Sequence, residues 1–129
     1  MLLRGLLEEA APEAVLADQH VNDGEVIEGG FRVLATAGPT PGHVAYLHEP
    51  SGTLFCGDAL AVVSDRLRLM ARPVTPDLPA ARRSAVRCLG AGARIICPGH
   101  RALLTHNVEQ ECRRLRNFLE TGGRWPLLG

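Results

Sequence analysis

The stretch FRVLATAGPTPGHVAYLHEPSGTLFCGDAL, residues 31–60, combines strand patterns, tight turns and side chains that can bind metal ions. Two apolar runs, Val44–His48 and Thr53–Cys56, flank the turn residues Glu49-Pro50-Ser51-Gly52, an arrangement typical of a hairpin. Gly57-Asp58 follows directly and ends the second strand with a carboxylate at its tip. We therefore expect a sheet here, with a polar group of the kind often found in functional sites at one edge.

The residues before this hairpin predict a further pair of strands and a loop. Glu25–Glu28 is expected to form a short strand that joins the strand Phe31–Thr36 through the turn Gly29-Gly30. The next segment is Gly38-Pro39-Thr40-Pro41-Gly42, in which two prolines remove backbone donors and two glycines permit unusual dihedral angles. This segment is therefore predicted to be a structured loop.

Downstream, two helices and a strand are expected. Asp77 can cap a helix that runs to about Leu89, where Gly90 ends it. Arg94–Cys97 is a short apolar strand that leads into Pro98-Gly99-His100, so a metal-binding type of side chain again lies at a strand tip. The last helix, 107–120, carries an apolar face with the periodicity of an amphipathic helix.

The N-terminal residues have leucines and alanines at helical spacing, although Pro12 must interrupt the pattern or begin a second short helix. We assign residues 1–17 as an N-terminal helical segment of one domain that spans residues 1–129. A helix at the start, with no strand before it, is an unusual beginning for an α/β domain and suggests that further sequence lies upstream.

The composition excludes several classes of protein. The length of 129 residues suits one domain, or part of a larger one, and the 46% of apolar residues is ordinary for a globular protein. The 14 basic and 14 acidic residues cancel without long runs, so we expect neither nucleic acid nor a membrane surface as a partner. The four cysteines form no C-x-x-C pair and follow no secretory signal, which favours free thiols and a cytoplasmic location.

The order of these motifs resembles the C-terminal half of the metallo-β-lactamase fold hydrolases, including glyoxalase II-like enzymes and lactonases. The resemblance covers about residues 18–105 and rests on G-D-A-L at 57–60, P-x-T-P-D at 73–77 and P-G-H at 98–100. It implies half of a four-layer αββα sandwich in which metal ions, commonly zinc, lie between the edges of two sheets. The expected fold is therefore α/β (α+β), with a mixed β-sheet and helices on one face.

The resemblance also implies a set of metal ligands. Asp58 matches the bridging carboxylate of the superfamily, and His100 matches its final histidine. For the third ligand, the register set by Tyr46 places Pro39 at the ligand position and makes His43 a non-ligand. In the alternative register, a loop shifted by four residues brings His43 to the metal.

The remaining ligands of the superfamily come from H-x-H-x-D-H in the first half, and this motif does not occur in the sequence. Zinc needs about three protein ligands, so Asp58 and His100 alone are expected to hold it weakly. One hypothesis is a hydrolase of lactones, esters or thioesters whose missing half comes from another chain, an upstream region or a second copy. A C2 homodimer would place two copies of both residues around one cleft. The other hypothesis is a non-catalytic half-domain that binds a partner.

The candidate ligands also have structural interpretations, because Asp58 and His100 can hydrogen-bond amides of their own turns and His43 can be satisfied by its loop. Cys56 and Cys97 lie in apolar strands near the candidate ligands, so a thiolate-rich zinc site is a further alternative to core packing. The arginines of residues 66–72 are predicted on a solvated face rather than in a phosphate clamp.

Overall fold

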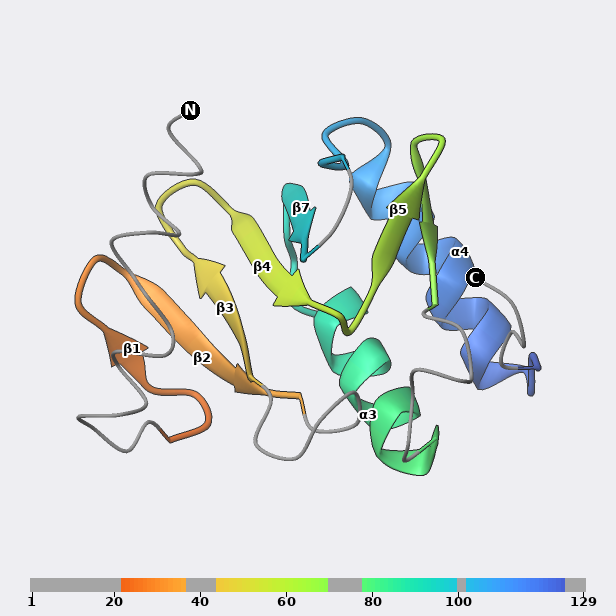
Figure 1. Ribbon diagram of the computed structural model, residues 1–129, viewed down its shortest axis with the longest axis horizontal. Helices are drawn as coiled ribbons and strands as arrows, with labels where there is room; N and C mark the ends of the chain where they lie inside the picture. Colours follow the sequence, from red (N-terminus) through yellow and green to blue (C-terminus); the bar gives the residue numbers. More distant parts are fainter. Residues whose placement is uncertain (1–21, 37–43, 70–77, 100–101, 125–129) are drawn as a thin grey trace.

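A five-stranded sheet forms the centre of the computed structural model, which describes residues 22–36, 44–69, 78–99 and 102–124. The strands lie in the order β1-β2-β3-β4-β7 (Figure 1). Neighbours are antiparallel from β1 to β4, whereas β7 is parallel to β4. The sheet is therefore mixed, as predicted. Its strands are β1 (Val26–Ile27), β2 (Phe31–Ala35), β3 (Val44–His48), β4 (Thr53–Gly57) and β7 (Ile95–Pro98).

The predicted strands are confirmed, with small differences at their ends. The hairpin between β3 and β4 closes where expected, through a hydrogen bond of 2.8 Å from the Gly52 N–H to the His48 carbonyl. β4 extends one residue beyond the prediction, and β7 lies one residue later than Arg94–Cys97, because Gly57 pairs with Pro98 across the two strands. The predicted loop 38–42 and the N-terminal helical segment 1–17 lie outside the described residues.

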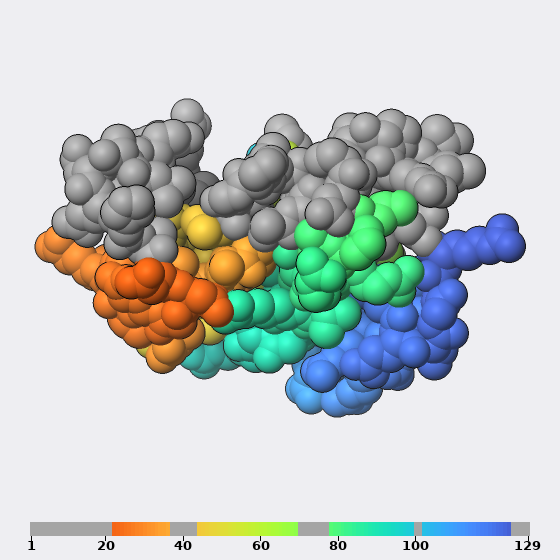
Figure 2. Space-filling model, turned by 90° about the horizontal axis from the view of Figure 1, so that it is seen from below, coloured from red at the N-terminus to blue at the C-terminus, as the bar shows by residue number. Residues whose placement is uncertain are grey.

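Two helices, α3 (Leu78–Leu89) and α4 (Val108–Glu120), cover one face of the sheet. They contact each other and lie side by side in Figure 2. Arg82 near the start of α3 donates to the carbonyl oxygens of Leu119 and Gly123 at the end of α4, so the helices are antiparallel. In the described part of the chain, no helix is both long and apolar enough to cross a membrane.

The helix ends largely follow the prediction. Gly122 and Gly123 end α4 with hydrogen bonds from their N–H groups to the carbonyls of Leu119 and Phe118, the pattern of a Schellman motif. At the other end, Asn107 adopts a left-handed conformation and its side chain makes no capping hydrogen bond. The predicted cap of α3, Asp77, lies outside the described residues.

The sheet and the helices enclose the larger of two apolar clusters. Alternate residues of β2 to β7 point toward the helices, and α3 and α4 present their buried faces to them. The smaller cluster lies on the opposite face of the sheet and contains Phe31, Val33, Tyr46 and Phe55, each at most 5% exposed. Both faces of the sheet are therefore apolar.

A second sheet, the hairpin of β5 (Ala61–Val63) and β6 (Arg66–Arg68), was not predicted. Its turn is Ser64-Asp65, whose φ angles of 51° and 60° are both left-handed. Glu111 of α4 holds the hairpin, because it accepts a hydrogen bond of 2.9 Å from the Leu67 N–H and pairs with Arg66 and Arg114. Arg66 lies on a solvated face, as predicted, and also pairs with the Glu111 carboxylate of α4.

Candidate functional site

The candidate site lies where β4 and β7 end. The two strands are parallel, so their C-terminal ends meet at the same edge of the sheet. The Gly99 N–H donates a hydrogen bond of 2.9 Å to the Gly57 carbonyl and extends the pairing past Pro98. Asp58 follows β4 directly, and Gly99 leads into position 100. The structure thus brings G-D-A-L and the first two residues of P-G-H, Pro98 and Gly99, to one edge.

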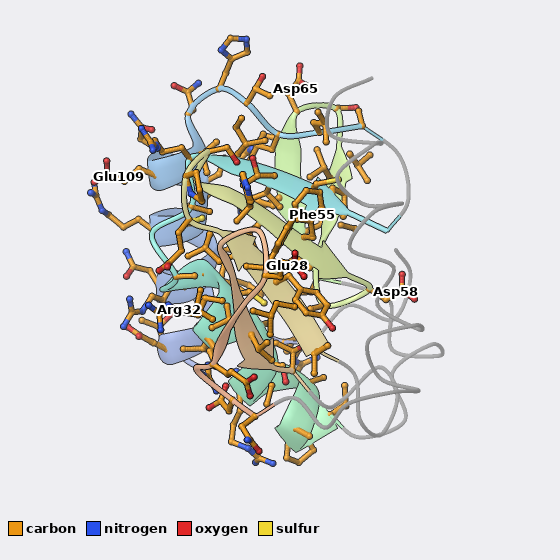
Figure 3. The ribbon with its side chains drawn as sticks, turned by 90° about the vertical axis from the view of Figure 1, so that its left-hand side faces the viewer. Glu28, Arg32, Phe55, Asp58, Asp65 and Glu109 are labelled. Atoms are coloured by element: carbon orange, nitrogen blue, oxygen red, sulfur yellow. The ribbon has the colours of Figure 1, made fainter. Side chains whose placement is uncertain are left out.

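A tight turn sets the position of Asp58. Gly57 has a φ of 53°, which glycine adopts without strain, and the Ala59 N–H donates to the Cys56 carbonyl at 3.0 Å. Ala59 and Leu60 are buried and anchor the chain beyond the turn. Asp58 itself is half-buried, and Figure 3 shows its carboxylate pointing away from the ribbon, on the side opposite Glu109 of α4.

The Asp58 carboxylate lies against the backbone of Gly99. A Cβ atom built on Gly99 would stand 3.2 Å from Oδ1 of Asp58 and 3.3 Å from the backbone carbonyl carbon of Gly57. The carboxylate therefore occupies space that a side chain at position 99 would need. A carboxylate oxygen held at a strand edge is a ligand type that zinc and iron accept, so Asp58 fits the role of one metal ligand.

The other predicted ligands lie outside the described residues, namely His100, His43 and the substituted position Pro39. Within the described ranges, no group of three or more histidine, cysteine, aspartate or glutamate side chains could hold a metal ion. The whole ligand set, Asp58 included, therefore stays a prediction. His48 belongs to a different place, since its Nδ1 lies 2.6 Å from Oγ of Ser51 at the far end of β4.

The surroundings of the cysteines favour core packing over the alternative thiolate-rich site. All four are free, and Cys56, Cys88 and Cys112 are buried. Burial raises the pKa of Cys88 to about 12 and that of Cys112 to about 11, and it raises the pKa of Cys56 further. These apolar surroundings are typical of thiols that pack in a core. Cys97 is half-buried, and burial raises its pKa as well.

Sequence reasoning identified Asp58 but missed its contact with Gly99. The contact depends on the parallel register of β4 and β7, which are about forty residues apart in the chain. The glycine of the P-G-H motif could have indicated this contact, because a glycine at a strand often marks a close approach of backbone or ligand.

Comparison with known proteins gives the family. A family model described as the metallo-beta-lactamase superfamily matches residues 6–100, which is most of the chain. No curated protein matches the sequence at a significant level.

Solved structures agree with this match. The chain is similar to a metallo-beta-lactamase family protein from Thermus thermophilus, with 26% identity, a TM-score of 0.55 and coverage of 89% of this chain and 46% of the other. TTHA1623 in a di-iron-bound form is also similar, with 26% identity and a TM-score of 0.55. The match covers 73% of this chain and 46% of the other. An archaeal metallo-beta-lactamase superfamily protein from Sulfolobus tokodaii shares 20% identity and a TM-score of 0.56, with coverage of 75% of this chain and 39% of the other. At this identity the likeness shows the fold alone.

The chain thus spans less than half the length of each of these structures. The family model and the motif order agree on the same residues, and the mixed sheet with helices on one face is a partial form of the superfamily's fold. The chain belongs to the metallo-beta-lactamase superfamily.

Proposed function

We propose that this chain contributes one half of a metal-dependent hydrolase site, which acts on acyl compounds such as lactones, esters or thioesters. The observation that carries the proposal is the edge at which Asp58 and Gly99 meet, in a chain of the metallo-beta-lactamase superfamily. The edge holds the Asp58 carboxylate on a hydrogen-bonded turn, and His100 follows Gly99 in the sequence. The same edge belongs to two parallel strands, a frequent location of sites in α/β proteins.

Zinc is the metal ion that we propose, with Asp58 and His100 as ligands from this chain and His43 as a third in the alternative register. The structure of TTHA1623 in a di-iron-bound form supports metal binding in the superfamily and makes iron the competing ion to test. A divalent ion held there would lower the pKa of a bound water, which is the chemistry that acyl hydrolysis at neutral pH requires. The part of this chain is to hold the Asp58 carboxylate at a fixed place.

The remaining ligands have to come from elsewhere, because H-x-H-x-D-H does not occur in the sequence. A second copy of the chain is the simplest source, since a C2 dimer would bring two Asp58 and two His100 side chains to one cleft. A complementary half-domain, on another chain or in an upstream region, is the alternative source. The free thiols support our proposal that the protein works in the cytoplasm, where disulfides are rare.

The test is zinc-dependent hydrolysis by the purified chain on a panel of one lactone, one ester and one thioester. The decisive variant is Asp58→Asn, which keeps the shape of the side chain and removes its charge. Asp65→Asn is the matched control, because Asp65 also lies in a tight turn but is exposed at the tip of the β5–β6 hairpin. We expect Asp58→Asn to abolish zinc-dependent turnover and Asp65→Asn to retain it. Equal activity of both variants would refute the proposed role of Asp58.

The second candidate is a non-catalytic half-domain that binds a partner. The missing H-x-H-x-D-H motif favours it, as does Pro39 at a predicted ligand position. It predicts a stable assembly that neither binds zinc nor hydrolyses any of the three substrates. The same panel, measured beside the assembly state, therefore separates the two candidates.

A further inference from the structure

We propose that Gly99 is a positioning residue, whose missing side chain leaves the space in which the Asp58 carboxylate is held. The consequence for metal binding rests on the function proposed above, whereas the positioning itself does not. Three observations carry the inference: the backbone conformation of Gly99, its contacts, and the hydrogen bond that fixes its neighbour.

The first observation is that Gly99 is not needed for its backbone conformation. Its φ angle lies outside the left-handed region, so other residues could adopt the same backbone without strain. Gly57, on the neighbouring strand, differs because its φ is 53°. Backbone conformation therefore does not explain the glycine at position 99. The remaining explanation is that a side chain would not fit there.

The second observation is what fills that space. A Cβ atom on Gly99 would meet Oδ1 of Asp58 at 3.2 Å, and the carbonyl carbon and Cα of Gly57 at 3.3 Å and 3.4 Å. The two shorter distances are tighter than most contacts of real Cβ atoms, so a neighbour would have to move by a few tenths of an ångström.

The third observation decides which neighbour moves. The backbone of Gly57 is paired with Pro98 and accepts the hydrogen bond of 2.9 Å from the Gly99 N–H, so it is tied to β7. The Asp58 carboxylate is the end of a side chain on a half-buried residue. A side chain can change its χ angles without breaking the strand pairing, so a substitution at Gly99 should displace the carboxylate.

Such a displacement matters for a metal ligand. Metal–ligand distances are held to about 0.2 Å, which is less than the displacement expected here. Groups that orient a ligand typically change metal affinity by about 10- to 100-fold when they are altered. We therefore expect Gly99→Val, whose side chain is branched at Cβ, to weaken zinc binding at least 10-fold, and Gly99→Ala to weaken it less.

The experiment compares Gly99→Ala and Gly99→Val with the control Gly123→Ala. A Cβ on Gly123 would stand 2.5 Å from the Phe118 carbonyl oxygen at the end of α4, so this control destabilises the fold away from the site. The direct readout is the ¹³Cγ NMR signal of Asp58 in metal-free protein labelled at aspartate. The second readout is zinc affinity by competition with a chromophoric chelator, with Asp58→Asn as the reference for a lost ligand.

We expect the Asp58 signal to move in both Gly99 variants, more in the valine variant, and to stay in place in Gly123→Ala. An unmoved signal in Gly99→Val would overturn the inference, as would a Gly99→Ala variant that does not fold, since Gly99 would then be a purely structural residue. If the signal moves while wild type and Asp58→Asn bind zinc equally weakly, the positioning role stands and the proposed metal site fails. If Asp58→Asn loses zinc but Gly99→Val keeps it and its Asp58 signal does not move, the proposed metal site stands and the positioning role of Gly99 fails.

Discussion

Replacement of Glu111 by glutamine tests how the β5–β6 hairpin is held on α4. Glu111 is 8% exposed and accepts hydrogen bonds from the Leu67 N–H and from Arg66 and Arg114. The hydrogen bonds of Arg114, then those of the Leu67 N–H and Arg66, outweigh burial and lower the pKa of Glu111 from an ordinary 4.5 to about 2. Because one pKa unit corresponds to about 1.4 kcal/mol, the ionised carboxylate stabilises the fold by about 3 kcal/mol.

The pH dependence follows from the direction of this pKa change. The folded pKa lies below the unfolded one, so the stabilisation is fully present above about pH 5 and is lost as the pH falls toward 2. We expect Glu111→Gln to lower the free energy of unfolding by about 3 kcal/mol at pH 7. At pH 3 the difference from wild type should be roughly half as large.

Urea denaturation at pH 7 and pH 3 measures both values. The matched control is Glu109→Gln, which removes an exposed carboxylate from the same helix. Glu109 is 83% exposed and pairs with Arg113 at 2.8 Å, so its loss should cost at most about 0.5 kcal/mol. The reasoning is refuted if the two variants are equally stable at pH 7, or if the cost of Glu111→Gln does not shrink at pH 3.

Three further predictions concern the helices and the thiols. Arg82→Ala removes hydrogen bonds to two carbonyls at and just beyond the C-terminal end of α4, and should destabilise the fold by about 1–2 kcal/mol. Its melting temperature should therefore fall, whereas that of the control Arg83→Ala, at an exposed position, should not. Equal melting temperatures would contradict a stabilising role of Arg82. Gly123→Ala should lower the free energy of unfolding in urea by more than about 1 kcal/mol, because its Cβ would overlap the Phe118 carbonyl and ring. An unchanged free energy would show that α4 can end in another backbone conformation. In native protein, iodoacetamide should label Cys97 first, since the other thiols are buried; peptide mapping that finds equal labelling of all four would contradict the packing.

The main sheet could be predicted from the sequence because its signals are local. The turn Glu49-Pro50-Ser51-Gly52 fixes the hairpin of β3 and β4, and Gly52 indeed has a φ of 70°. Gly29-Gly30 likewise fixes the link between β1 and β2. Such turns set the register of antiparallel neighbours directly. The parallel pairing of β4 and β7 was implied only by the family resemblance.

The β5–β6 hairpin could not be predicted for two physical reasons. Its strands are three residues long, and its turn, Ser64-Asp65, lacks the glycine that usually accompanies two left-handed residues. The hairpin is also held from outside, by Glu111 of α4, and a long-range contact of this kind has no local signature. A buried glutamate on an otherwise ordinary amphipathic helix face could not be distinguished from an exposed one.

The candidate site shows the same division. Asp58 could be placed at a strand tip from G-D-A-L alone, and the structure confirms that position. The contact with Gly99 could not be foreseen, because it depends on how far β7 extends beside β4. The assignments of His100, His43 and Pro39 remain predictions from the resemblance.

Native mass spectrometry, with and without zinc, tests the central claim most directly because it reports assembly state and bound metal together. Wild type and Asp58→Asn should be compared under the same conditions. Our account predicts an assembly of wild-type chains that holds one or two zinc ions per pair, and a loss of zinc in Asp58→Asn. A wild-type species that stays metal-free at every stoichiometry, or the same zinc content in both proteins, would contradict it.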